Sequence, residues 1–66
     1  MKQTIIASGT RVRLLTMNDP QAPPVGTLGT VADSVGMGSW VLIAVQWDNG
    51  SYLGLAVPPD RYEVVK

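Results

Sequence analysis

The prolines and glycines between residues 23 and 31 constrain the fold of this chain more than any other feature. The run reads Pro23-Pro24-Val25-Gly26-Thr27-Leu28-Gly29-Thr30-Val31. Proline fixes an extended lead-in, and glycine serves where φ is positive or where two backbones approach closely. We therefore expect Gly26 and Gly29 to mark the entry into a strand of a small β-structure. A phosphate-binding loop is the alternative, but such loops lead into a helix N-terminus, whereas Thr30 and Val31 continue as strand.

Length and composition indicate one small domain. A chain of 66 residues buries only roughly 60% of the surface that its unfolded form exposes. We therefore expect a small free energy of unfolding. Apolar residues make up 45% of it, but Phe and Cys are absent, so no disulfide supports the core. Five basic residues balance five acidic ones, which disfavours nucleic-acid binding. Residues 1–6 are too short and polar for a signal-peptide core, and no stretch is apolar enough to span a bilayer, so we expect a cytoplasmic protein outside the membrane.

The first half of the chain predicts two strands separated by a stiff loop. Residues 11–15 alternate, which places Val12 and Leu14 on one face and Arg11 and Arg13 on the other. Residues 16–25 hold three prolines and cannot join a central ladder. Residues 27–35 return as a strand, and residues 36–39 have the composition of a turn.

The second half predicts three more strands. Residues 40–47 are dense in β-branched and aromatic types, as expected of a central strand. Asn49-Gly50 favours a two-residue type I′ turn with positive φ at both positions, after which residues 51–57 run back antiparallel. Residues 58–60 close that strand, in one helical turn, before residues 62–65 form the last strand. We expect a flexible segment over residues 1–8 and a single domain over residues 9–66.

Five short strands without a helix predict an all-β fold, namely a small SH3-like barrel with a long proline-rich loop after the first strand. From residue 9 to residue 65 the chain also resembles the small bacterial and phage proteins grouped as domain of unknown function 4314. The resemblance is carried by Gly9-x-Arg11-Val12-Arg13-Leu14, Met17-x-Asp19-Pro20, the run from Pro23 to Val31, and Val45-x-Trp47-Asp48-Asn49-Gly50-Ser51. It implies an SH3-like fold and residence in phages or mobile elements, and it implies no activity. The chain departs from the family pattern in residues 35–43, where Met37, Trp40 and Leu42 make the segment longer and more apolar.

The residue types argue against an enzyme. The chain has no His and no Cys, so the usual general base, thiolate nucleophile and main zinc ligands are absent. Asp19 and Asp48 lie in predicted loops, where aspartate ordinarily forms turns through its neighbouring backbone. We therefore expect no catalytic residue, no metal site and no cofactor.

The strand predicted over residues 40–47 has two apolar faces. If its odd-numbered residues point into the core, Trp40, Leu42 and Ala44 lie on the opposite face, which should be polar in a lone barrel. Either the proline-rich loop or the N-terminal segment covers this face, or another molecule does. We expect a homo-oligomer that contacts itself through Trp40, Leu42 and Ala44.

Three functions fit this pattern. The first is a non-catalytic counter-defence module that sequesters a small anionic or nucleotide-type ligand, with charge from Arg11 and Arg13 and stacking from Trp40 or Tyr52. The bland alternative is that both arginines only keep their strand soluble. The second function is an SH3-like adaptor for a host protein or peptide, and the third, which the neutral charge disfavours, is nucleic-acid binding. Our candidate ligand- or partner-binding residues are Arg11, Arg13, Asp19, Pro23, Pro24, Trp40, Trp47 and Tyr52.

Overall fold

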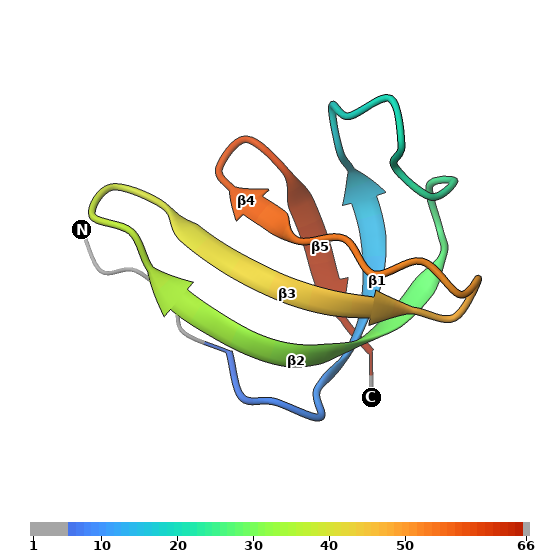
Figure 1. Cartoon of the computed structure of the whole chain (residues 1–66), viewed down its shortest axis with the longest axis horizontal. Coiled ribbons are helices and arrows are strands. Elements are labelled where there is room, and N and C mark those ends of the chain that lie inside the picture. Colours follow the sequence, from blue (N-terminus) through green and yellow to red (C-terminus); the bar gives the residue numbers. More distant parts are fainter. Residues whose placement is uncertain (1–5, 66) are drawn as a thin grey trace.

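One antiparallel sheet of five strands forms the whole fold. The computed structural model describes residues 6–65, and Figure 1 shows the strands in chain order. They are β1 (Arg11–Thr16), β2 (Leu28–Gly36), β3 (Val41–Trp47), β4 (Leu55–Val57) and β5 (Arg61–Val64). Their order across the sheet is β4-β3-β2-β1-β5. Residues 6–65 contain no helix, which confirms the all-β class, and hence none that could cross a membrane.

The sheet curves but does not close. The long strand β2 pairs with β3 along most of its length and with β1 at its first residues, and its register shifts between Val31 and Asp33. Such a bulge bends a strand and increases its twist, and in Figure 1 β2 curves along β3 and extends beyond β1. Among the described residues no ladder joins β4 to β5, so both strands remain edges. The closed barrel expected from the sequence is therefore not formed.

The core lies on the inner, concave side of the sheet, as the strand patterns predict. Val12 and Leu14 are fully buried in β1, while Arg11 and Arg13, which alternate with them, face outward. In β3 the odd-numbered residues are buried and the even-numbered ones are half-buried or exposed. The buried core consists of Ile6, Val12, Leu14, Val31, Val41, Ile43, Val45, Trp47 and Leu55.

The two glycines of the opening run mark the entry into β2, as predicted, and the structure gives each a different role. Gly26 has φ +94° and is the third residue of a turn in which the Thr27 N–H donates to the Pro24 carbonyl over 3.0 Å. Gly29 lies inside β2, where an added Cβ would be 2.6 Å from Val45 Cγ1 and 2.7 Å from a ring carbon of Trp47. Glycine at this position therefore lets β2 pack directly against the core face of β3.

The turn after β3 differs from the prediction. No residue other than glycine has positive φ in the described chain, so Asn49 does not adopt the type I′ conformation. Instead, the Gly50 N–H donates to the Trp47 carbonyl, and the Trp47 N–H donates to the Ser51 carbonyl. Within this loop, Gly50 alone has positive φ, at +95°. This is a three-residue loop with a glycine bulge, in which only the last position needs glycine.

Three further local predictions are wrong. The strand expected over residues 51–57 is confined to β4, and before it Tyr52 makes only an isolated bridge to Gln46. Residues 58–60 form a turn rather than a helical turn. Trp40, expected to begin the strand, lies in the β2–β3 connection.

The described part of the N-terminal segment lies along β2. The Ile6 side chain belongs to the core. Its N–H donates to Ser34 Oγ over 3.0 Å, and the Ser34 hydroxyl donates back to the Ile6 carbonyl over 2.8 Å. Residues 1–5, the greater part of the segment expected to be flexible, lie outside the described residues.

Candidate binding surface on the outer face of the sheet

A row of polar side chains crosses four neighbouring segments on the outer face of the sheet. Arg11 pairs with Thr30, Thr30 with Gln46, and Gln46 with Tyr52. Directly paired residues of antiparallel strands share one face, and adjacent strands are about 4.8 Å apart. These four residues, which we call the polar row, therefore span roughly 14 Å. The Tyr52 side chain at one end is prominent, since 66% of its surface is exposed.

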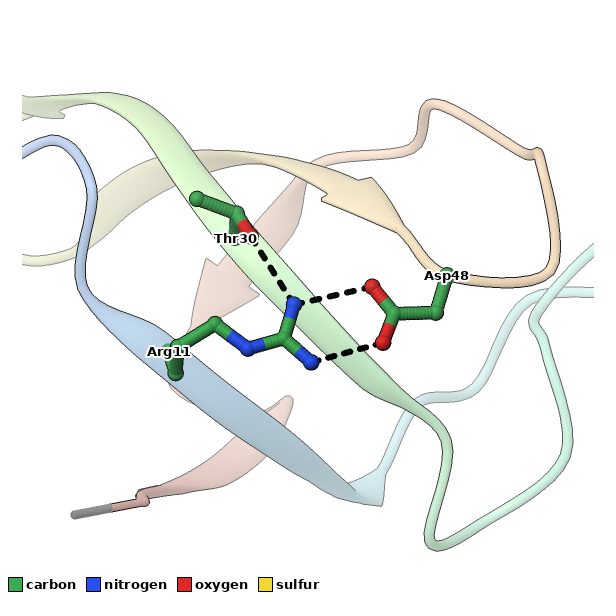
Figure 2. Close-up of polar contacts among 3 residues, drawn as sticks. All are labelled: Arg11, Thr30 and Asp48. Atoms are coloured by element: carbon green, nitrogen blue, oxygen red, sulfur yellow. Dashed lines mark hydrogen bonds and ion pairs between the residues drawn. The ribbon is translucent and has the colours of Figure 1, made fainter.

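The other end of the polar row is held by a two-point ion pair. Arg11 donates to both carboxylate oxygens of Asp48, from Nη1 over 2.9 Å and from Nη2 over 2.6 Å. Nη1 also donates to Thr30 Oγ1 over 2.9 Å, as Figure 2 shows. Arg11 extends from β1, while Asp48 begins the loop after β3. The guanidinium therefore links two segments that lie on opposite sides of β2.

The ion pair shifts the titration of both groups. The hydrogen bonds from Arg11, aided by its positive charge, outweigh the opposing effect of desolvation and hold the pKa of Asp48 below its ordinary range. The same bonds raise the pKa of Arg11. Both side chains remain about half exposed, so solvent screens the ion pair and its net contribution to folding stability is modest. Its clearest effect is to fix the orientation of the guanidinium.

Arg13 is also paired within the chain. It lies directly opposite Glu63 of β5 and forms an ion pair with that carboxylate. Both arginines predicted to bind an anion are thus already matched by a carboxylate of their own chain. The sequence suggested Asp48 only as a turn former and singled out no role for Glu63, because both pairings depend on strand register.

Beyond the polar row, most residues of the outer face are apolar, although the exposed Asp33 lies opposite Ala44. Val35, Leu42 and Ala56 form a direct cross-strand row, and Ala44 follows Leu42 on the same face of β3. Met37 and Trp40 continue the apolar surface in the β2–β3 connection, where the Met37 N–H donates to the Trp40 carbonyl. Leu42 is 38% exposed although it lies on an interior strand. We call these residues the apolar patch: Val35, Met37, Trp40, Leu42, Ala44 and Ala56.

The remaining predicted site residues are scattered. Trp47 is 2% exposed, and its indole N–H donates to the Leu53 carbonyl over 3.0 Å, so its ring lies in the core and does not reach the surface. Pro23 is buried and Pro24 belongs to the turn before β2. Asp19 accepts the Gln21 N–H, which is the turn-forming role expected of it. Of the predicted set, only Arg11 and Tyr52 share the polar row.

The sequence did not single out Thr30 as part of a site. Thr30 belongs to the polar row only because β2 places it between Arg11 and Tyr52, and no local signal in the sequence marks that position. Gln46 was recognised only as the polar member of its strand face. Among residues 6–65 no cluster of three or more His, Cys, Asp or Glu side chains is suited to a metal ion.

Comparison with known proteins gives one match. The family model described as Domain of unknown function (DUF4314) matches residues 2–65, nearly the whole chain. No curated protein and no solved structure was found to match.

Proposed function

The chain belongs to the DUF4314 family, and we propose that it is a non-catalytic binding module that self-associates and sequesters a small anionic or nucleotide-type ligand. The observation that supports this function best is the outer face of the sheet. There the polar row, with Arg11 and Tyr52 at its ends, adjoins the apolar patch on the same strands. A face of this kind offers one surface for a second protomer and another for a ligand beside it.

The apolar patch supports self-association. Monomers seldom expose a contiguous apolar patch without using it, and burial of such surface stabilises a contact by about 25 cal/mol per Å². A stable interface buries about 800 Å² on each partner. A contact of that size is about a fifth of the 4288 Å² of accessible surface of the molecule.

The polar row supports a ligand with both a ring and an anionic group. The exposed Tyr52 ring is free to stack, and the Gln46 amide beside it offers both a donor and an acceptor. Arginine carries five N–H donors, and Asp48 and Thr30 engage only part of them. A phosphate oxygen therefore has donors to bind on Arg11 while the ion pair persists.

Light scattering over micromolar to millimolar concentration tests the self-association. We expect an oligomer for the natural chain and a smaller mass for Leu42→Lys, which places a charge in the apolar patch. Val25→Lys is the matched control, because Val25 is an exposed aliphatic residue outside the patch. A monomer at every concentration would refute this half of the proposal.

Thermal melting with a panel of cyclic and linear nucleotides tests the ligand. A ligand that binds only the folded state at 100 times its Kd stabilises the protein by about 2.7 kcal/mol. We expect a rise in Tm for at least one nucleotide and its loss in Tyr52→Ala. No rise for any nucleotide would remove the ligand from the proposal.

A second candidate is an SH3-like adaptor for a host protein or peptide. The strand order β4-β3-β2-β1-β5 supports the SH3-like assignment, and the apolar patch suits a protein partner as well as a second protomer. The buried Trp47 is not available to such a partner, so Trp40 and Tyr52 are the two predicted aromatic site residues left to it. Capture from host lysate by the natural chain but not by Leu42→Lys would favour the adaptor. A phage or mobile-element origin and a cytoplasmic location remain parts of our proposal, and nucleic-acid binding remains the least favoured function.

A further inference from the structure

The two edge strands of the sheet, β4 and β5, differ in whether their outward backbone groups are hydrogen-bonded. At the β4 edge, the Ala56 N–H donates to Asp60 Oδ2 over 2.9 Å, and the Asp60 N–H donates to the Ala56 carbonyl over 2.9 Å. Ala56 is the central residue of β4. Its outward donor and acceptor are therefore both engaged, which protects this edge from pairing with another strand.

The side of β2 that extends beyond β1 is protected as well. The Gly9 N–H donates to the Val31 carbonyl over 2.7 Å, and the Val31 N–H donates to the Thr10 carbonyl over 2.9 Å. Farther along, Ile6 and Ser34 exchange two hydrogen bonds. The segment before β1 thus acts as a cover for this part of β2.

The β5 edge has no such cover among the described residues. Leu14 directs its N–H to Thr27 and its carbonyl to the Gly26 N–H, so its backbone groups face β2. Tyr62 lies directly opposite Leu14 on the other side, and Val64 lies opposite Val12. In an antiparallel ladder such positions direct their own N–H and C=O groups away from the partner strand. Within residues 6–65 no hydrogen bond engages these outward groups of Tyr62 and Val64.

The side chains at this edge are also incompletely covered. Val64 is on the same side of the sheet as the buried Val12, yet 50% of its surface is exposed. Tyr62 is partly buried against the core. An apolar side chain on the core side of a sheet becomes exposed where no next strand follows, and this is the situation of Val64.

We propose that β5 pairs antiparallel with β5 of a second copy of this chain, with Tyr62 opposite Val64 of the second copy. This register engages the outward backbone groups of both residues on both strands. It also places the Tyr62 ring beside the exposed Val64 of the other copy, and aromatic and β-branched residues form favourable cross-strand pairs. The protected β4 edge leaves no place for a head-to-tail pairing of β4 with β5.

The charges are compatible with this register. Glu63 lies opposite Glu63 of the second copy, but each of them already pairs with its own Arg13. The four charged groups therefore sum to zero around the symmetry axis. The edge contact uses a different surface from the apolar patch, so it goes beyond the proposed function. Two separate two-fold contacts on one chain generate either a closed assembly of four subunits or an open chain.

Two substitutions of Val64 test the edge contact. Val64→Pro removes an outward N–H that no residue of the described chain uses, whereas Val64→Thr retains the N–H and the β-branched shape. We expect Val64→Pro to halve the mass of the assembly in light scattering and Val64→Thr to leave it unchanged. An unchanged mass for a folded Val64→Pro would overturn the inference.

Amide hydrogen exchange gives a second measurement that needs no proline. We expect the Tyr62 and Val64 amides to become protected as concentration rises, in the natural chain and, at millimolar concentration, in Leu42→Lys. The inference would be overturned if both amides exchanged, at every concentration, as fast as amides of an unpaired edge strand. If Leu42→Lys keeps the natural mass while Val64→Pro halves it, the edge contact stands and the contact through the apolar patch is wrong. The opposite result retains the patch and excludes the edge.

Discussion

The guanidinium of Arg11 extends across β2 and donates two hydrogen bonds to the Asp48 carboxylate. Thr30, on the strand between them, accepts a third bond from the same guanidinium. The loop after β3 is thereby attached to β1, which is not its neighbour in the sheet. This contact keeps the polar row ordered at one end and has consequences for the pH dependence of stability.

We predict that the contribution of Asp48 to stability disappears in acid. Its pKa is lowered in the folded state, so protonation favours the unfolded chain. The contribution is therefore fully present above the ordinary aspartate pKa of about 4 and is lost as pH falls through the lower folded value. Urea unfolding of the natural chain and Asp48→Asn should give different stabilities near neutral pH that converge in acid. A difference that does not shrink as the pH falls below the ordinary aspartate range would contradict this prediction, as would an equal effect in the control Asp33→Asn. Within the described residues, the Asp33 carboxylate accepts only the Ser34 N–H.

We predict that Gly29→Ala destabilises the fold by about 1–3 kcal/mol, the range for overpacking in a dense core. The added methyl group overlaps Val45 and the Trp47 ring. Gly26→Ala is the matched control, because Gly26 has positive φ but open space around its Cβ position; there we expect about 1 kcal/mol of backbone strain. Chemical denaturation measures both. A cost for Gly29→Ala below that of Gly26→Ala would mean that the close approach is not structurally important.

We predict that Trp47→Phe costs about 1–3 kcal/mol, because it leaves the Leu53 carbonyl without its partner and removes buried ring volume. Trp40→Phe provides the comparison, since Trp40 is only half-buried and lies outside the core cluster. We expect it to change stability by less than about 0.5 kcal/mol in the isolated protomer. Equal losses for the two variants would contradict the assignment of Trp47 to the core and Trp40 to the surface.

We predict that Asp60→Ala exposes the β4 edge. It removes the acceptor of the Ala56 N–H, which should cost about 1 kcal/mol. It should also increase concentration-dependent aggregation, because an open edge strand templates pairing with other chains. Asp60→Asn keeps an amide oxygen at this position and should behave like the natural chain. Turbidity on heating and dynamic light scattering measure the difference, and equal behaviour of Asp60→Ala and Asp60→Asn would exclude edge protection by the side chain.

Local patterns in the sequence were sufficient for the number and order of the strands and for the buried faces of β1 and β3. Alternation assigned Val12 and Leu14 inward, and the glycine run correctly indicated the entry into a strand, which is the start of β2. These properties depend on a residue and its near neighbours, so they can be read from a short window. The turn type at Asn49-Gly50 was predicted wrongly, because the choice between two- and three-residue loops depends on which strand residues finally pair.

The outer surface was decided by contacts between distant segments. Thirty-seven positions separate Arg11 from Asp48, and the polar row exists only because four segments meet in one register. The capped β4 edge and the open β5 edge likewise depend on which backbone groups each ladder leaves unused. Hydrophobic periodicity specifies which face of a strand is buried, but it does not specify which residues lie opposite one another across the sheet. For this chain, the core could therefore be inferred from the order of its residues, whereas the candidate binding surface required the register of the folded sheet.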